Sequence, residues 1–136
     1  MNKPRRNFLM GAGAAAAATP AAGATSGKVK VQGGVRMGNL FFSSGLTGVR
    51  PDATDIRAQT HNILKQQKAN LEALGSSLEN VIKVTAFLAD VKTHKPAFNE
   101  VYAQYFPKDP PARTALGAIF PDTQTLVEIE LVAWIP

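Results

Sequence analysis

The segment 125–135 restricts the fold most, because apolar residues fall on both faces of the strand that it predicts. Two apolar rows alternate along it: Val127, Ile129, Leu131 and Ala133 on one side, and Leu126, Val132 and Trp134 on the other. A chain of 136 residues is one domain's worth of material, and it offers few helices to cover a sheet. The uncovered face of the sheet is therefore expected to bind further copies of the chain.

Hydrophobic periodicity predicts five strands and two helices. The strands are expected at 28–31, 40–44, 80–89, 113–120 and 125–135, and the helices at 52–75 and 96–106. The first two strands are expected to form a hairpin through a turn at Met37-Gly38-Asn39. The order strand, strand, helix, strand, helix, strand, strand predicts an α+β fold, a mixed sheet with both helices on one face.

Cap residues mark the ends of both helices. Asp52, Thr54 or Asp55 can cap the first helix, and Gly75 supplies its stop. Pro96 suits the first turn of the second helix, because a proline there gives up no helical hydrogen bond, and Pro107 ends that helix.

Residues 1–24 have the three parts of an export signal. Lys3, Arg5 and Arg6 precede a weakly apolar run rich in Ala and Gly, and Ala22-Gly23-Ala24 offers a cleavage site. The paired arginines before Asn7-Phe8-Leu9 resemble the twin-arginine consensus, which predicts an exported, periplasmic protein. The run is about a dozen residues, against about 20 for a membrane span, so stable membrane insertion is not expected. Retention as an uncleaved anchor is the alternative.

Composition excludes several functions. The chain has no cysteine, so it has no disulfide, thiolate metal site or cysteine nucleophile. The formal net charge of +5 falls to +2 once the three basic residues of the signal are removed, and the remaining lysines are scattered. Nucleic acid is therefore not an expected partner. His61 and His94 lack partners at ligand spacing, so a metal site is not expected, and structural roles are favoured for both.

Two features of the mature domain, residues 25–136, could carry chemistry. Arg113 follows the rigid Pro110-Pro111 turn at the mouth of a strand, where a guanidinium can capture a carboxylate in bidentate geometry. Glu128 and Glu130 share one strand face beside apolar residues, where a carboxyl can act as a general acid or base. The pattern alone favours the plainer alternative of a surface arginine and two glutamates that deter aggregation of an edge strand.

An ordered series of short motifs favours the functional interpretation of Arg113 and Glu128 instead. The series consists of Gly38-Asn39-Leu40-Phe41-Phe42-Ser43-Ser44-Gly45, Gln59-Thr60, Asn70-Leu71, Val81-Ile82-Lys83-Val84-Thr85-Ala86-Phe87-Leu88-Ala89-Asp90, Asn99-Glu100-Val101-Tyr102, Pro111-Ala112-Arg113 and Val127-Glu128-Ile129-Glu130. In order and spacing the series resembles the RidA (YjgF, reactive intermediate deaminase) family across nearly all of the mature chain. The resemblance departs at Val31, where an aromatic residue is usual, and at Leu46, where Gln is common.

The resemblance implies a chorismate-mutase-like fold and a homotrimer with three clefts between subunits. It also implies hydrolysis of 2-imino and 2-enamino acids to 2-keto acids and ammonia, without metal or cofactor. Arg113 then matches the arginine that binds the substrate carboxylate, and Glu128 the carboxyl that positions or activates water. Ser44 and Gly45 match the cleft wall, and Asn99 a helix residue near the site.

Two other functions stay open at this point. A trimer that binds or sequesters small carboxylates through Arg113 without catalysis would use the same residues. Family members have also been described as ribonucleases or translation inhibitors, a function that the small mature charge and the export signal disfavour.

Overall fold

The computed structural model describes residues 27–136, and the export signal predicted at 1–24 lies outside them. The strands are β1 (Lys28–Val31), β2 (Gly34–Met37), β3 (Leu40–Ser43), β4 (Leu46–Thr47), β5 (Val81–Leu88), β6 (Ala112–Gly117) and β7 (Val127–Trp134). The helices are α1 (Ile56–Ala73), the short 3₁₀ helix η1 (Leu78–Asn80) and α2 (Val91–Tyr105).

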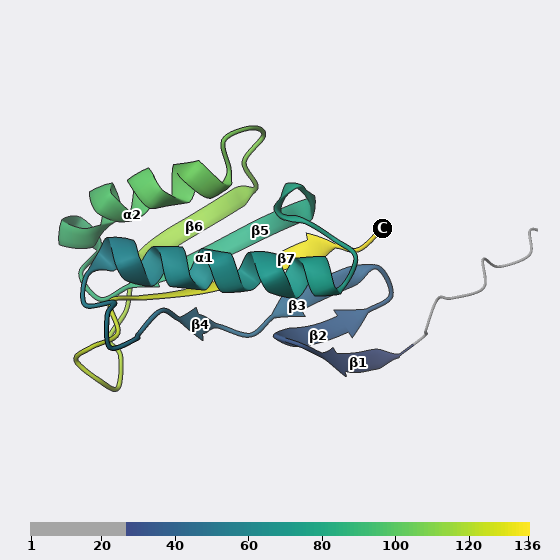
Figure 1. Cartoon of the computed structure of the whole chain (residues 1–136), viewed down its shortest axis with the longest axis horizontal. Helices are drawn as coiled ribbons and strands as arrows, with labels where there is room; N and C mark the ends of the chain where they lie inside the picture. The colour runs from purple at the N-terminus through teal and green to yellow at the C-terminus, as the bar shows by residue number, and fades with distance from the viewer. Residues whose placement is uncertain (1–26) are drawn as a thin grey trace, which may run out of the picture.

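All seven strands form one mixed sheet. The order is β1-β2-β3-β7-β5-β6, and β4 continues the line of β3 along β7. Every pairing is antiparallel except that of β5 with β6, which are joined through α2. Figure 1 shows α1 and α2 lying side by side over one face of this sheet. The predicted mixed sheet with both helices on one face is confirmed.

The N-terminal hairpin differs from the prediction, because strand β2 lies between the two strands that were expected to pair. β1 turns back at Gln32-Gly33 to pair with β2, and the turn at Gly38-Asn39 joins β2 to β3. Gly33 and Gly38 have φ of +78° and +57°, so both tight turns need the left-handed conformation that glycine adopts without strain. The four residues of β2 show too little alternation of apolar and polar side chains to predict a strand.

The ends of α1 follow the sequence, whereas α2 begins earlier than predicted. Asp55 caps α1 by accepting a hydrogen bond from Ala58 N, and Gly75 ends it with φ of +74°. Helix α2 starts at Val91 because Asp90 Oδ1 accepts hydrogen bonds from Lys92 N and Thr93 N. Pro96 therefore lies inside the helix, on its exposed side, where its missing N–H costs one helical hydrogen bond.

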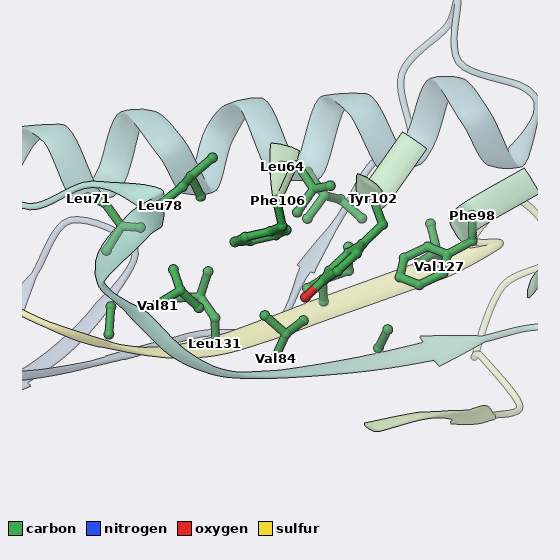
Figure 2. Packing of buried hydrophobic residues seen from close by; sticks show 14 of the residues in the cluster. Leu64, Leu71, Leu78, Val81, Val84, Phe98, Tyr102, Phe106, Val127 and Leu131 are labelled. Carbon is green, nitrogen blue, oxygen red and sulfur yellow. The ribbon is translucent and has the colours of Figure 1, made fainter. Parts of the chain in front are cut away.

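The core fills the space between the two helices and the sheet. Leu64 and Leu71 of α1, Phe98 of α2, and Val84 and Val127 of the sheet are completely buried in it (Figure 2). The opposite face of the sheet is not covered by a helix and carries large apolar side chains among polar ones. Large exposed side chains there include Phe42, Leu116 and Trp134, with 44%, 40% and 47% of their surfaces accessible.

Candidate functional site

Arg113 lies on the edge strand β6 and faces α2. Its backbone pairs with Val84 of β5, whose side chain is completely buried under the helices, so Arg113 lies on the helix-covered face of the sheet. The guanidinium carbon is 4.5 Å from the ring centroid of Tyr102 and 5.5 Å from that of Phe98. Within residues 27–136 the side chain has neither a hydrogen-bond acceptor nor an ion-pair partner. Its N–H groups are therefore free to bind an anion.

A hollow of about 350 Å³ opens beside this guanidinium. Its lining consists of Asn99, Tyr102, Ala103, Phe106, Pro110, Pro111 and Arg113. Asn99 Oδ1 is buried and lacks a donor among the described residues. The structure thus brings two of the sequence-predicted site residues, Arg113 and Asn99, to the same hollow, and proline and aromatic surface makes up most of its remaining wall.

Glu128 lies on β7, opposite Thr47 of β4 and Phe87 of β5. Its carboxylate reaches Gly45: a Cβ atom at Gly45 would lie 1.9 Å from Glu128 Oε1. A side chain at position 45 would therefore displace this carboxylate from its place. The structure brings together the predicted residues Ser44, Gly45 and Glu128, at the place where β3 gives way to β4.

A β-bulge produces this arrangement. β3 pairs with β7 up to Phe42↔Val132, and β4 resumes the pairing at Leu46↔Ile129, so residues 43–45 lie opposite only two residues of β7. Ser43 replaces the missing backbone pairing at this bulge. Its Oγ accepts hydrogen bonds from Leu131 N at 2.8 Å and from Gln67 Nε2 at 3.0 Å.

Sequence reasoning missed both Ser43 and the completely buried Gln67. The only available signal was a glutamine on the apolar stripe of a helix.

The two groups of predicted site residues lie on opposite faces of the sheet. Val127 and Ile129 are completely buried under the helices, so the alternation along β7 places Glu128 on the far face. Glu130 shares that far face and is exposed, pairing with Thr85 of β5. One copy of the chain therefore does not assemble Arg113 and Glu128 into one pocket.

His61 contacts a tyrosine on the neighbouring helix. His61 Nδ1 is 3.1 Å from the hydroxyl of Tyr105, an exposed contact between α1 and α2. No group of three or more His, Asp or Glu side chains in residues 27–136 is placed to hold a metal ion. Within the same range, no helix is long and apolar enough to span a membrane.

The two positions that depart from the family pattern contribute to the core of a single chain. Val31 and Leu46 are partly buried and pack against the hydrophobic core. Val31 comes directly before the turn at Gln32-Gly33, and Leu46 follows Gly45 as the first residue of β4.

Comparisons with known proteins agree with this fold. The model of the family described as "Endoribonuclease L-PSP" matches residues 25–135. A RutC family protein of Pyrococcus horikoshii is 39% identical over 105 residues, which cover 74% of this chain and 82% of that protein. Reactive Intermediate Deaminase A, chloroplastic, of Arabidopsis thaliana is 34% identical over 104 residues, which cover 73% of this chain and 55% of that longer protein.

Solved structures give the same result. A member of the YjgF/YER057c/UK114 family from Mycobacterium tuberculosis superposes with a TM-score of 0.69 at 30% identity, over 76% of this chain and 85% of that one. A yeast protein, YEO7, superposes with a TM-score of 0.70 at 34% identity, over 76% and 86% of the two chains. The fold is thus that of the chorismate-mutase-like α+β proteins. Within that class, the chain belongs to the RidA/YjgF/L-PSP family.

Proposed function

We propose that the protein hydrolyses 2-imino and 2-enamino acids to 2-keto acids and ammonia, in clefts between the subunits of a homotrimer. The observation that carries this proposal is that the guanidinium of Arg113 has no partner in the described part of its own chain and borders a hollow. Its guanidinium lies at a hollow of about 350 Å³, is held against two aromatic rings, and has no acceptor among residues 27–136. A planar fork of unpaired N–H donors fits the carboxylate that all of these substrates share.

The chemistry needs one bound water and one carboxylate. With Arg113 holding the substrate carboxylate, Glu128 accepts a proton from water as the water oxygen adds to the imine carbon. That proton passes to the nitrogen, which gives a tetrahedral carbinolamine with a hydroxyl and an amine on one carbon. Glu128 then takes the hydroxyl proton and delivers it to the same nitrogen as the carbon–nitrogen bond breaks, so ammonia leaves and the carbonyl of the 2-keto acid forms. An enamine enters the same sequence after protonation at its carbon, which converts it to the imine.

The homotrimer supplies both halves of this site. Arg113 faces the helices of its own subunit and Glu128 faces the opposite side of the sheet, so we propose that each cleft takes Arg113 from one subunit and Glu128 from its neighbour. The exposed apolar side chains of Phe42, Leu116 and Trp134 on the open face support this assembly, because exposed apolar surface of this kind marks interfaces. Closing three such sheets around an axis buries the face and brings neighbouring edges together.

The test is ammonia release from enzymatically generated 2-imino acids by the purified mature protein, residues 25–136. Release above the spontaneous rate is expected, and Arg113→Ala is expected to return it to the spontaneous rate. Binding of 2-keto acids without any release would instead indicate a carrier for small carboxylates, which is the alternative function. Absence of both binding and release would overturn the role of Arg113.

We propose further that residues 1–24 direct export to the periplasm by the twin-arginine route. Arg5, Arg6 and the small residues before position 25 support this assignment, and the family match begins directly after the proposed signal, at residue 25. Fractionation of the native host is expected to recover a protein that starts near Thr25 outside the cytoplasm. Recovery of only the full-length chain from the cytoplasm would contradict the assignment.

A further inference from the structure

We propose that Phe98 and Tyr102 are positioning residues that hold the guanidinium of Arg113 by its flat face and so orient its fork toward the ligand. This inference deepens the proposed function and rests on it for the identity of the ligand as a small carboxylate. Neither aromatic residue belongs to the set that the sequence predicted for the site.

Both rings are fixed before any ligand arrives. Phe98 is completely buried and Tyr102 is 6% exposed, and they lie one turn apart on α2. Their ring centroids are 5.6 Å apart, and the Tyr102 ring stacks in turn on Phe106 at 4.6 Å. Figure 2 shows Tyr102 between these two phenylalanines, over the sheet. Arg113 therefore rests on a rigid surface rather than on mobile side chains.

The way in which Arg113 is held decides what it can bind. The N–H bonds of a guanidinium lie in its plane, whereas an aromatic ring attracts the cation through its face. A carboxylate of the protein would occupy the same N–H groups that a ligand needs. Neither Phe98 nor Tyr102 accepts a hydrogen bond from the guanidinium that it contacts, so the fork of N–H donors stays available to the ligand.

The ring of Tyr102, and not its hydroxyl, serves this purpose. The hydroxyl oxygen is buried, has no hydrogen-bond partner among the described residues and is directed toward the sheet (Figure 2). Burial raises the pKa of Tyr102 to about 12, which Arg113 opposes only in part, so the hydroxyl stays neutral at physiological pH. Phenylalanine at position 102 should therefore support Arg113 as well as tyrosine does.

The experiment compares Tyr102→Phe with Tyr102→Leu in the mature trimer. The first readout is the ¹⁵N–¹H NMR signal of Arg113 Nε, assigned by its loss in Arg113→Lys, because ring faces at 4.5 Å and 5.5 Å shift this signal upfield. The signal is expected to stay in place in Tyr102→Phe and to move toward the ordinary arginine position in Tyr102→Leu. Phe41→Leu is the matched control, since Phe41 is a completely buried aromatic on β3, and it should leave the signal unchanged.

The second readout is binding and turnover. Pyruvate is the probe for binding, and its Kd is expected to stay within about twofold in Tyr102→Phe and to rise by about 3- to 30-fold in Tyr102→Leu, the range that cation–π energies give. With imino acids, KM should rise while kcat stays nearly constant, because the contact is made equally in the bound substrate and the transition state. Phe98→Leu should act in the same direction by a smaller amount and serves if Tyr102→Leu fails to fold.

The outcomes separate the two proposals. An unchanged Arg113 signal in both leucine variants, or unchanged pyruvate affinity in both, would overturn the positioning role. If the wild-type protein itself neither binds pyruvate nor releases ammonia, the proposed function fails, while the NMR comparison still decides whether the rings hold Arg113.

Discussion

Arg113 and Glu128 lie on opposite faces of the same sheet, separated by β5. Arg113 is in register with Val84, and Val84 is in register with Leu131, so these three side chains share the helix-covered face. Glu128, three residues before Leu131 on β7, has the opposite parity and lies beside Gly45 on the far side. If both residues act on one substrate, the substrate must bind between two copies of the chain.

Replacing Arg113 by lysine tests the geometry of the fork separately from its charge. Lysine keeps the positive charge but lacks both bidentate donors and a flat face, so binding of 2-keto acids should weaken by roughly 1.5–3 kcal/mol. The melting temperature should barely move, because Arg113 makes no hydrogen bond or ion pair within residues 27–136. Calorimetric titration and thermal melts measure the two effects. Equal affinity in both proteins would place the carboxylate site elsewhere.

Removing the Ser43 hydroxyl should destabilise the bulge that presents Gly45 to Glu128. In Ser43→Ala, the backbone N–H of Leu131 and the amide of Gln67 lose their shared acceptor, which should lower the free energy of unfolding by about 1–3 kcal/mol. Ser44→Ala is the matched control for stability, because Ser44 is exposed, and it should change that free energy by less than about 0.5 kcal/mol. Denaturant unfolding compares the two, and equal effects would refute the role of Ser43.

The two tyrosines should ionise separately. Burial raises the pKa of both Tyr102 and Tyr105, and that of Tyr102 reaches about 12. The folded state therefore favours the neutral form of Tyr102, and this contribution to stability is complete below pH 10 and is lost as the pH rises toward 12. Absorbance of the phenolate at alkaline pH should show one tyrosine ionising near pH 12, and Tyr102→Phe should remove that step. Ionisation of both groups near pH 10 would contradict the described burial.

A charge on the open sheet face should prevent assembly. Trp134 is 47% exposed in the monomer, so Trp134→Glu should fold but should sediment as a monomer, because a trimer would bury the carboxylate. Ala69→Glu adds the same charge to the exposed side of α1 and should remain trimeric. Sedimentation velocity at micromolar concentration distinguishes them. A trimeric Trp134→Glu variant would mean that this face is not the interface.

The sequence predicted the helices and strands that are marked by their own residues, through caps, stops and long apolar runs. Helix α1 carries its own cap at Asp55 and its own stop at Gly75, and the long strands β5 and β7 carry enough apolar residues to be recognised. The strands β2 and β4 have only four and two residues, and pairing with β3 and β7 rather than intrinsic preference makes them strands. Helix α2 begins before Pro96 because the Asp90 cap outweighs the cost of an internal proline.

The sequence predicted candidate site residues but not their arrangement in space. Motif order predicted five candidates: Arg113, Glu128, Ser44, Gly45 and Asn99. Their division between two faces of the sheet depends on strand register, which the sequence does not reveal without knowing which strands pair. The helical spacing of Phe98 and Tyr102 predicts only that they face the core. In the structure they face the core and also contact the guanidinium of Arg113.

The most direct test of a site shared between subunits mixes two inactive variants, Arg113→Ala and Glu128→Ala. Each variant alone should lack imine hydrolysis. After joint unfolding and refolding of equal amounts, clefts that receive an intact arginine from one subunit and an intact glutamate from the next should restore about a quarter of the wild-type rate, as random assembly dictates. If both residues of a working site came from one chain, no mixed trimer would contain an intact site, and the mixture would stay inactive.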